Sequence, residues 1–91
     1  MITKITIQIK DLRVLDLYSG TGSFGLECLS RGASYALFVE NDKDALKNLN
    51  KNIKNLFFEK KTTISNQDIY LFFKKSFFDK KFDLIFFDPP Y

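Results

Sequence analysis

The chain has 91 residues, below the usual ~100–150 of a domain, so it can hold one domain at most. A hydrophobic share of 45% excludes a disordered chain, and a net charge of +3 permits a nucleic-acid partner without demanding one. The lysine excess stands beside eleven phenylalanines, and AT-rich codons favour both, so the lysines are weak evidence for a polyanionic partner. Cys28 is the only cysteine, which excludes an internal disulfide and a cysteine zinc cluster.

Neither a membrane span nor a secretion signal is found in the sequence. No stretch approaches the ~20 apolar residues of a transmembrane helix. Met1–Lys10 lacks the uninterrupted apolar run of a signal peptide. We therefore expect a cytoplasmic protein without a membrane partner.

The first elements along the chain read as strand, strand and helix. Ile2–Lys10 alternates apolar and polar residues as a strand does. Arg13–Tyr18 is a short apolar run that leads into a glycine-rich stretch, as expected of a buried parallel strand. Ser23–Arg31 has the apolar spacing of a helix, and Gly32 stands where the end of a helix favours glycine.

A second strand and a longer helix follow. Tyr35–Glu40 predicts the strand, and Asn41 or Asp42 can cap a helix that runs to about Leu56. The apolar positions of this helix share one face: Ala45, Leu46, Leu49, Ile53 and Leu56.

The last elements repeat the alternation. Thr62–Ser65 predicts a third strand, Asp68 to about Ser76 a third helix, and Phe82–Phe87 a fourth strand. Four strands separated by helices indicate a parallel α/β sheet. In such a sheet the ligand lies at the carboxyl ends of the strands.

The first candidate site is the glycine-rich stretch Asp16–Gly25, between a strand and a helix. It contains the spacing G-x-G-x-x-G, which by itself also fits a dinucleotide-binding module or a plain strand-turn-helix connection. Asp16 argues against a dinucleotide ligand, because a carboxylate at this place would repel the pyrophosphate. S-adenosylmethionine has no phosphate but carries an ammonium and a sulfonium, so the acid favours this ligand.

Two further acids follow the next strands. Glu40 comes twenty residues after Gly20 and can accept hydrogen bonds from a ribose diol, or serve as an acid before a helix. Asn41, its neighbour, is grouped with it as a cofactor contact. Asp68 can accept from an adenine amino group, cap a helix, or do both.

The most specific signal is Asp88-Pro89-Pro90-Tyr91, directly after the fourth strand. Consecutive prolines lock the backbone and remove two N–H donors. The Asp88 carboxylate and the Pro89 carbonyl can then hold both hydrogens of an exocyclic amine, and Tyr91 offers a face on which a base can stack. The alternative is a strand that prolines merely end.

Lysines form a stripe on the second predicted helix. Lys43, Lys47 and Lys51 recur every four residues, with Lys54 nearby, opposite the apolar face. We favour a solvated helix face over a contact with RNA, because this helix should lie behind the cofactor.

From Leu12 to Tyr91 the chain resembles the bacterial 16S ribosomal RNA guanine-N2 methyltransferases of the RsmD type. The resemblance rests on VLDLYSGTGSFGLECLSRGA, then FVEND, then FFDPPY. It implies a Rossmann-like class I methyltransferase fold with sheet order 3-2-1-4. The implied cofactor is S-adenosylmethionine, held by Asp16, Tyr18, Ser19, Gly20, Gly22, Glu40, Asn41 and Asp68. The implied amine-binding residues are Asp88, Pro89, Pro90 and Tyr91.

The resemblance also implies a reaction and a partner. The methyl group would pass directly from the sulfonium to the amine of a guanine, with positioning supplying most of the acceleration and without a metal. The base would have to leave its stack, which favours a loop of 16S ribosomal RNA or an assembly intermediate of the small subunit. Open alternatives are a DNA adenine-N6 methyltransferase, an NAD-binding module and an inactive remnant.

The resemblance implies a longer protein as well. Family members have a basic segment before the first strand and continue past the DPPY turn with further strands. We therefore expect residues 1–91 to form a single partial methyltransferase domain, which acts as a monomer at full length. Alone, these residues should self-associate through the last strand and show no turnover.

Overall fold

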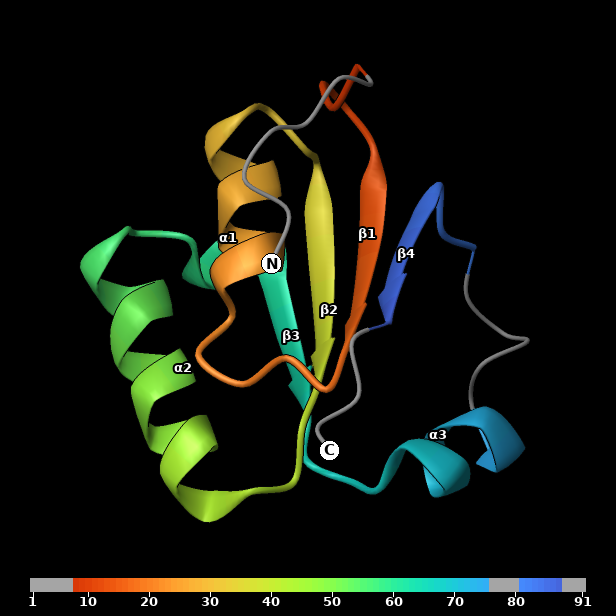
Figure 1. The fold of residues 1–91 in the computed structure, drawn as a ribbon. Coiled ribbons are helices and arrows are strands. Elements are labelled where there is room, and N and C mark those ends of the chain that lie inside the picture. The colour runs from red at the N-terminus through yellow and green to blue at the C-terminus, as the bar shows by residue number, and fades with distance from the viewer. Residues whose placement is uncertain (1–7, 76–80, 88–91) are drawn as a thin grey trace.

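Parallel strands form a single sheet in the described part of the chain (Figure 1). The structure is a computed structural model, and it describes residues 8–75 and 81–87. In chain order the strands are β1 (Arg13–Leu17), β2 (Tyr35–Val39), β3 (Thr62–Ser65) and β4 (Leu84–Phe87). They lie side by side as β3-β2-β1-β4, and each neighbouring pair is parallel. The predicted order is confirmed, and β1 is paired on both sides.

Helices cover both faces of this sheet (Figure 1). On one face lie α1 (Ser23–Ser30) and α2 (Lys43–Asn55), and on the other lies α3 (Ile69–Lys75). A short 3-10 helix, η1 (Glu59–Lys61), leads from α2 to β3 and was not among the predicted elements. None of the helices in the described residues is long and apolar enough to span a membrane.

The side chains of β1 and β2 point alternately into two cores. Toward α1 and α2, Val14 and Phe38 pack in one buried cluster. Toward α3, Leu15 and Val39 pack with Phe72 in another. Strands buried on both faces read as near-continuous apolar runs, which is why their positions could be predicted.

Local chemistry sets the ends of the helices as expected. Gly32 follows α1 with a φ of 100°, in the left-handed region that favours glycine. Of the two candidate caps for α2, Asp42 is the N-cap, since its side chain accepts the N–H of Ala45 at 2.9 Å.

The predicted apolar face of α2 holds along most of its length. Leu49 and Ile53 are buried, and Ala45 and Leu46 are half-buried. Leu56 is 47% exposed, so its assignment to this face is wrong. The reason is that α2 ends one residue earlier and Leu56 is its C-cap, which turns away from the helical period.

Two strands end before the residues predicted to close them. β1 stops at Leu17 because Tyr18 enters the left-handed region, with a φ of 57°. β2 stops at Val39, where the Glu40 side chain turns to bind backbone N–H groups.

The fourth strand starts two residues later than predicted, at Leu84. Asp83 pairs with Arg13 partly through its side chain, whose Oδ2 accepts the N–H of Arg13 at 2.8 Å. A side-chain acceptor thus replaces a strand carbonyl at this point.

Two predicted elements lie partly outside the described residues. The third helix was expected from Asp68 to about Ser76, and α3 is described as Ile69–Lys75. The strand expected over Ile2–Lys10 is described only from Gln8, and residues 8–10 do not form a strand.

Candidate functional site

The residues that connect β1 to α1, Tyr18–Gly22, form a tight turn at the carboxyl edge of the sheet and are here called the glycine loop. Gly20 and Gly22 have φ values of 58° and 83°, which glycine adopts without strain. The Gly22 N–H donates to the Ser19 carbonyl at 2.8 Å, and the Ser19 hydroxyl donates to the Asp16 carbonyl at 2.6 Å. The loop therefore closes back onto the end of β1.

Glu40 joins the glycine loop to the end of β2. Its Oε1 accepts the N–H of Gly20 at 2.7 Å. Its Oε2 accepts the N–H groups of Asn41 and Asp42 at 3.2 and 3.0 Å, just before α2 begins. Each carboxylate oxygen has two acceptor sites, so Oε1 keeps one for a further donor beside the loop.

Asp16 is a buried carboxylate, only 1% exposed. Its Oδ2 accepts the N–H of Gly25 at 3.0 Å, in the first turn of α1, where the helix dipole favours an anion. A Cβ on Gly25 would lie 2.4 Å from Cε1 of Phe38 and 3.1 Å from Asp16 Oδ2. The third glycine of the motif therefore allows α1 to approach β1 and β2 closely.

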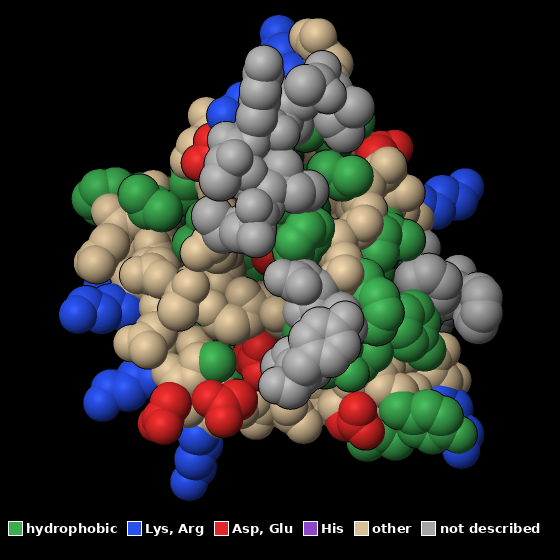
Figure 2. All heavy atoms as spheres, in the orientation of Figure 1, with side chains coloured by type: hydrophobic (Ala, Val, Ile, Leu, Met, Phe, Trp, Pro, Cys, Tyr) green, Lys and Arg blue, Asp and Glu red, His purple; other side chains and the backbone are tan. Residues whose placement is uncertain are grey.

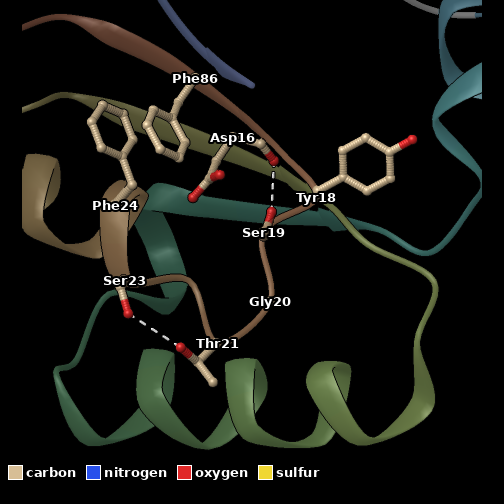
Figure 3. A pocket seen from close by; sticks show the side chains of 8 residues that line it. All are labelled: Asp16, Tyr18, Ser19, Gly20, Thr21, Ser23, Phe24 and Phe86. Atoms are coloured by element: carbon tan, nitrogen blue, oxygen red, sulfur yellow. Dashed lines mark hydrogen bonds between the residues drawn. The ribbon is translucent and has the colours of Figure 1, made fainter. Parts of the chain in front are cut away.

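A hollow of about 210 Å³ opens between the glycine loop, the start of α1 and β4 (Figure 3). Its lining residues are Asp16, Tyr18, Ser19, Gly20, Thr21, Ser23, Phe24 and Phe86. The structure thus brings together four predicted cofactor contacts, Asp16, Tyr18, Ser19 and Gly20. Thr21, Ser23 and Phe24 also lie within the candidate stretch Asp16–Gly25. Sequence reasoning missed Phe86, because an apolar residue in a buried strand carries no ligand signal of its own.

Aromatic contacts hold β4 against this edge of the site. The rings of Phe24 and Phe86 stack with centroids 4.0 Å apart and an interplanar angle of 13°. The rings of Tyr18 and Phe87 lie 5.6 Å apart. The predicted amine-binding turn, Asp88–Tyr91, lies outside the described residues, and it follows Phe87 directly in the chain.

Four predicted cofactor contacts do not line the hollow: Gly22, Glu40, Asn41 and Asp68. Glu40 reaches it only through its hydrogen bond to Gly20. Asp68 lies between β3 and α3, and its Oδ1 accepts the N–H of Tyr70 at 3.1 Å. The carboxylate therefore serves the start of α3, which is the capping role weighed in the sequence. Contacts of these residues with a cofactor remain predictions.

Sequence reasoning also missed Asn52, on α2. Its side-chain Nδ2 donates to the Thr21 carbonyl at 3.0 Å, so a helix thirty-one residues along the chain binds the glycine loop. The sequence showed only a polar residue directly before Ile53, which belongs to the apolar face of α2. In the structure Asn52 is half-buried. Only the packing of α2 beside the loop reveals its partner.

Cys28 lies on the buried face of α1. Burial, together with the charges of Asp16 and Glu27, raises the pKa of its thiol to about 11. The thiol is therefore protonated at neutral pH. In the described residues no group of His, Cys, Asp and Glu is arranged to hold a metal ion.

Known proteins resemble this chain in sequence and fold. A small-subunit ribosomal RNA methyltransferase D of Buchnera aphidicola is 36% identical over 83 residues, which cover 91% of this chain and 42% of the relative. The Haemophilus influenzae protein of the same name is 37% identical over 78 residues, covering 85% of this chain and 40% of the relative. The chain thus spans less than half the length of these relatives.

The structure also resembles yhhF of Escherichia coli, a solved protein described as a candidate methyltransferase. The TM-score is 0.83 at 31% identity, and the match covers 91% of this chain and 45% of that protein. The predicted Rossmann-like methyltransferase fold is thereby confirmed.

The family model described as Conserved hypothetical protein 95 matches residues 1–91. This match and the two methyltransferase D relatives confirm the resemblance found in the sequence. The chain therefore belongs to the Conserved hypothetical protein 95 family, that of the RsmD-type proteins.

Proposed function

We propose that the hollow beside the glycine loop binds S-adenosylmethionine and that the chain belongs to an enzyme that methylates ribosomal RNA. The observation that carries the proposal is the pair of carboxylates, Asp16 and Glu40, on either side of the loop. Glu40 suits a ribose diol, which both S-adenosylmethionine and NAD carry. Asp16 separates the two ligands, because a pyrophosphate would meet its negative charge whereas an ammonium and a sulfonium match it. This favours S-adenosylmethionine over NAD.

The shape of the loop supports the same ligand. A Cβ on Gly20 would meet no atom within 4 Å, so the loop backbone faces open space where a ligand can approach it closely. Glu40 would accept hydrogen bonds from the ribose hydroxyls through the remaining acceptor site of Oε1. Asp16, held by the N–H of Gly25, would face the cationic end of the ligand.

The finer proposal concerns the target, the N2 amine of a guanine in 16S ribosomal RNA. The bound cofactor would supply an electrophilic methyl group on a positively charged sulfur. Asp88 and the carbonyl of Pro89 would accept the two amine hydrogens and orient the nitrogen lone pair, and Tyr91 would stack on the base. The names of the relatives favour RNA over DNA, and a ribosomal substrate implies action in the cytoplasm.

Calorimetry tests the cofactor. We expect the chain to bind S-adenosylmethionine and its demethylated product, and to show no heat with NAD. Binding of NAD alone would reject the site assigned here. The same titration with Asp16→Ala should show weaker binding, since a charged hydrogen-bonding group is worth ~1.5–3 kcal/mol.

A full-length relative tests the substrate. Tritiated S-adenosylmethionine should label unmethylated ribosomal RNA and leave duplex DNA unlabelled. In that protein the equivalent of Asp88→Ala should keep cofactor affinity and lose turnover, because the carboxylate meets only the target amine. Labelling of DNA adenine would instead support the alternative target.

A further inference from the structure

An exposed aromatic residue follows α2 in a backbone conformation that aromatic residues rarely adopt. Phe57 is 86% exposed and has a φ of 61°. Glycine is the usual residue at this position after a helix, because a Cβ is strained there. Its neighbour Phe58 packs against the core on the side of α1 and α2. Core packing thus explains Phe58 and leaves both the strain and the exposure of Phe57 unexplained, which points to function.

The connection that carries Phe57 is held in place by hydrogen bonds. The N–H of Phe57 donates to the Lys54 carbonyl and that of Phe58 to the Ile53 carbonyl, both at 3.1 Å. The N–H of Lys61 and the hydroxyl of Thr62 both donate to the Phe58 carbonyl at 3.0 Å. The backbone of Phe57 is therefore fixed at both ends, and the ring is presented outward from a defined position.

Unpaired lysines surround this ring in the sequence. Lys54, Lys60 and Lys61 are exposed, and none of them forms an ion pair in the part of the chain that the structure describes. Residues 54–61 hold three lysines and one acid, a net charge of +2. In Figure 2, Lys and Arg side chains project along the edge where α2 lies in Figure 1, and hydrophobic side chains stand above them.

We propose that Phe57, Lys54, Lys60 and Lys61 form an RNA-contact surface. An unpaired base would stack on the ring of Phe57, and the three lysines would neutralise neighbouring phosphates. An exposed aromatic ring with exposed lysines close to it in the chain is typical of surfaces that bind single-stranded nucleic acid. A protein partner would need a broader apolar patch, and among the described residues next to Phe57 in the chain only Leu56, 47% exposed, adds to it.

The position of this surface gives it a distinct role. It lies at the amino end of β3, and the hollow lies at the carboxyl edge of the sheet (Figure 1). It would therefore hold the RNA at a distance from the methylated base. This inference rests on the proposed function, since it presumes an RNA substrate.

Fluorescence anisotropy of the full chain with a short, labelled single-stranded RNA of mixed sequence tests the surface, at several salt concentrations. Phe57→Ala and Phe57→Gly should each weaken binding about five-fold or more. Phe57→Gly also relieves the backbone strain, so it should melt no lower than the native chain. Replacing Lys54, Lys60 and Lys61 by Ala should reduce the slope of log affinity against log salt by about 0.7 per lysine.

Matched controls separate RNA binding at this surface from non-specific effects of net charge and of exposed aromatic rings. Replacing Lys43, Lys47 and Lys51 by Ala removes as many charges from α2 and should leave the salt slope unchanged. Tyr70→Ala removes another exposed aromatic ring, on α3, and should leave RNA affinity unchanged.

Two results would overturn the inference. One is native RNA affinity in Phe57→Gly, and the other is an equal loss of slope in the two lysine variants. Calorimetry with S-adenosylmethionine on the same preparations keeps the two proposals apart. Intact cofactor binding with unchanged RNA affinity rejects this surface alone, whereas absence of cofactor binding rejects the proposed function.

Discussion

The side-chain amide of Asn52 donates a hydrogen bond to the carbonyl oxygen of Thr21, with 3.0 Å between nitrogen and oxygen. Thr21 lines the hollow, so this bond ties α2 directly to the glycine loop. The bond between Gly20 and Glu40 ties the same loop to the end of β2. The glycine loop is therefore shaped from outside by two elements that follow it in the chain.

Asn52→Ala should weaken the binding of S-adenosylmethionine about five-fold, since a neutral hydrogen bond is worth ~1 kcal/mol. The loop would lose a fixed point and would have to be ordered by the ligand. Isothermal titration calorimetry measures the change. Asn50→Ala is the matched control, because the Asn50 amide donates to the Leu46 carbonyl of its own helix. Equal losses in the two variants would show that the effect comes from α2 stability.

Glu40→Ala should weaken cofactor binding more strongly, by about ten-fold or more, because charge-assisted hydrogen bonds are worth ~1.5–3 kcal/mol. The variant loses the acceptor for Gly20 and the proposed acceptor for the ribose. Equilibrium binding of the labelled cofactor gives the ratio. Glu59→Ala, an exposed acid on η1, should bind as the native chain does. Native affinity in Glu40→Ala would remove this residue from the site.

Most of the fold could be predicted because β1 and β2 are buried on both faces and α2 has one apolar stripe. Those patterns are local properties of the sequence. The ends of the elements were harder, since they depend on single side chains. Asp83, for example, replaces a strand partner of Arg13 with its carboxylate. A pattern of apolar residues does not show where a side-chain carboxylate, and not a strand carbonyl, accepts a backbone N–H.

The residues of the candidate site also fall into those that the sequence predicts and those that it does not. Asp16, Glu40 and the glycines could be found because their spacing relates them to strand ends. Phe86 could not, because an apolar residue in a buried strand has the same pattern whether or not it faces a hollow. Asn52 could not either, because its partner Thr21 is close only after α2 has packed.

Two glycines should respond differently to alanine. Gly25→Ala places a Cβ 2.4 Å from the buried ring of Phe38, and such overpacking typically costs ~1–3 kcal/mol. Gly20→Ala meets no atom within 4 Å, and its φ of 58° costs only about 1–2 kcal/mol of backbone strain. Urea denaturation should show both losses. Only Gly25→Ala should also displace the Asp16 carboxylate, so its cofactor affinity should fall further than that of Gly20→Ala.

Stability should fall at alkaline pH through Cys28. Burial raises the pKa of its thiol from 9.0 to about 11, so the folded chain keeps a proton that the unfolded chain releases. Below pH 9 the contribution of the neutral thiol is fully present, and it is lost as the pH rises toward 11. Denaturant midpoints across this range give the slope, and Cys28→Ala should flatten it. A thiol that reacts rapidly with a disulfide reagent at pH 8 in the folded chain would contradict the burial of Cys28.

The central place of β1 has a consequence for how a ligand enters the hollow. In the described residues β1 is hydrogen-bonded on both sides, so its amide hydrogens should exchange with solvent only when the whole sheet opens. Asp16 belongs to this slowest-exchanging strand, and its carboxylate accepts the N–H of Gly25. The acidic wall of the hollow is thus fixed before any ligand arrives. A ligand should therefore enter a hollow whose electrostatic half is already in its final geometry.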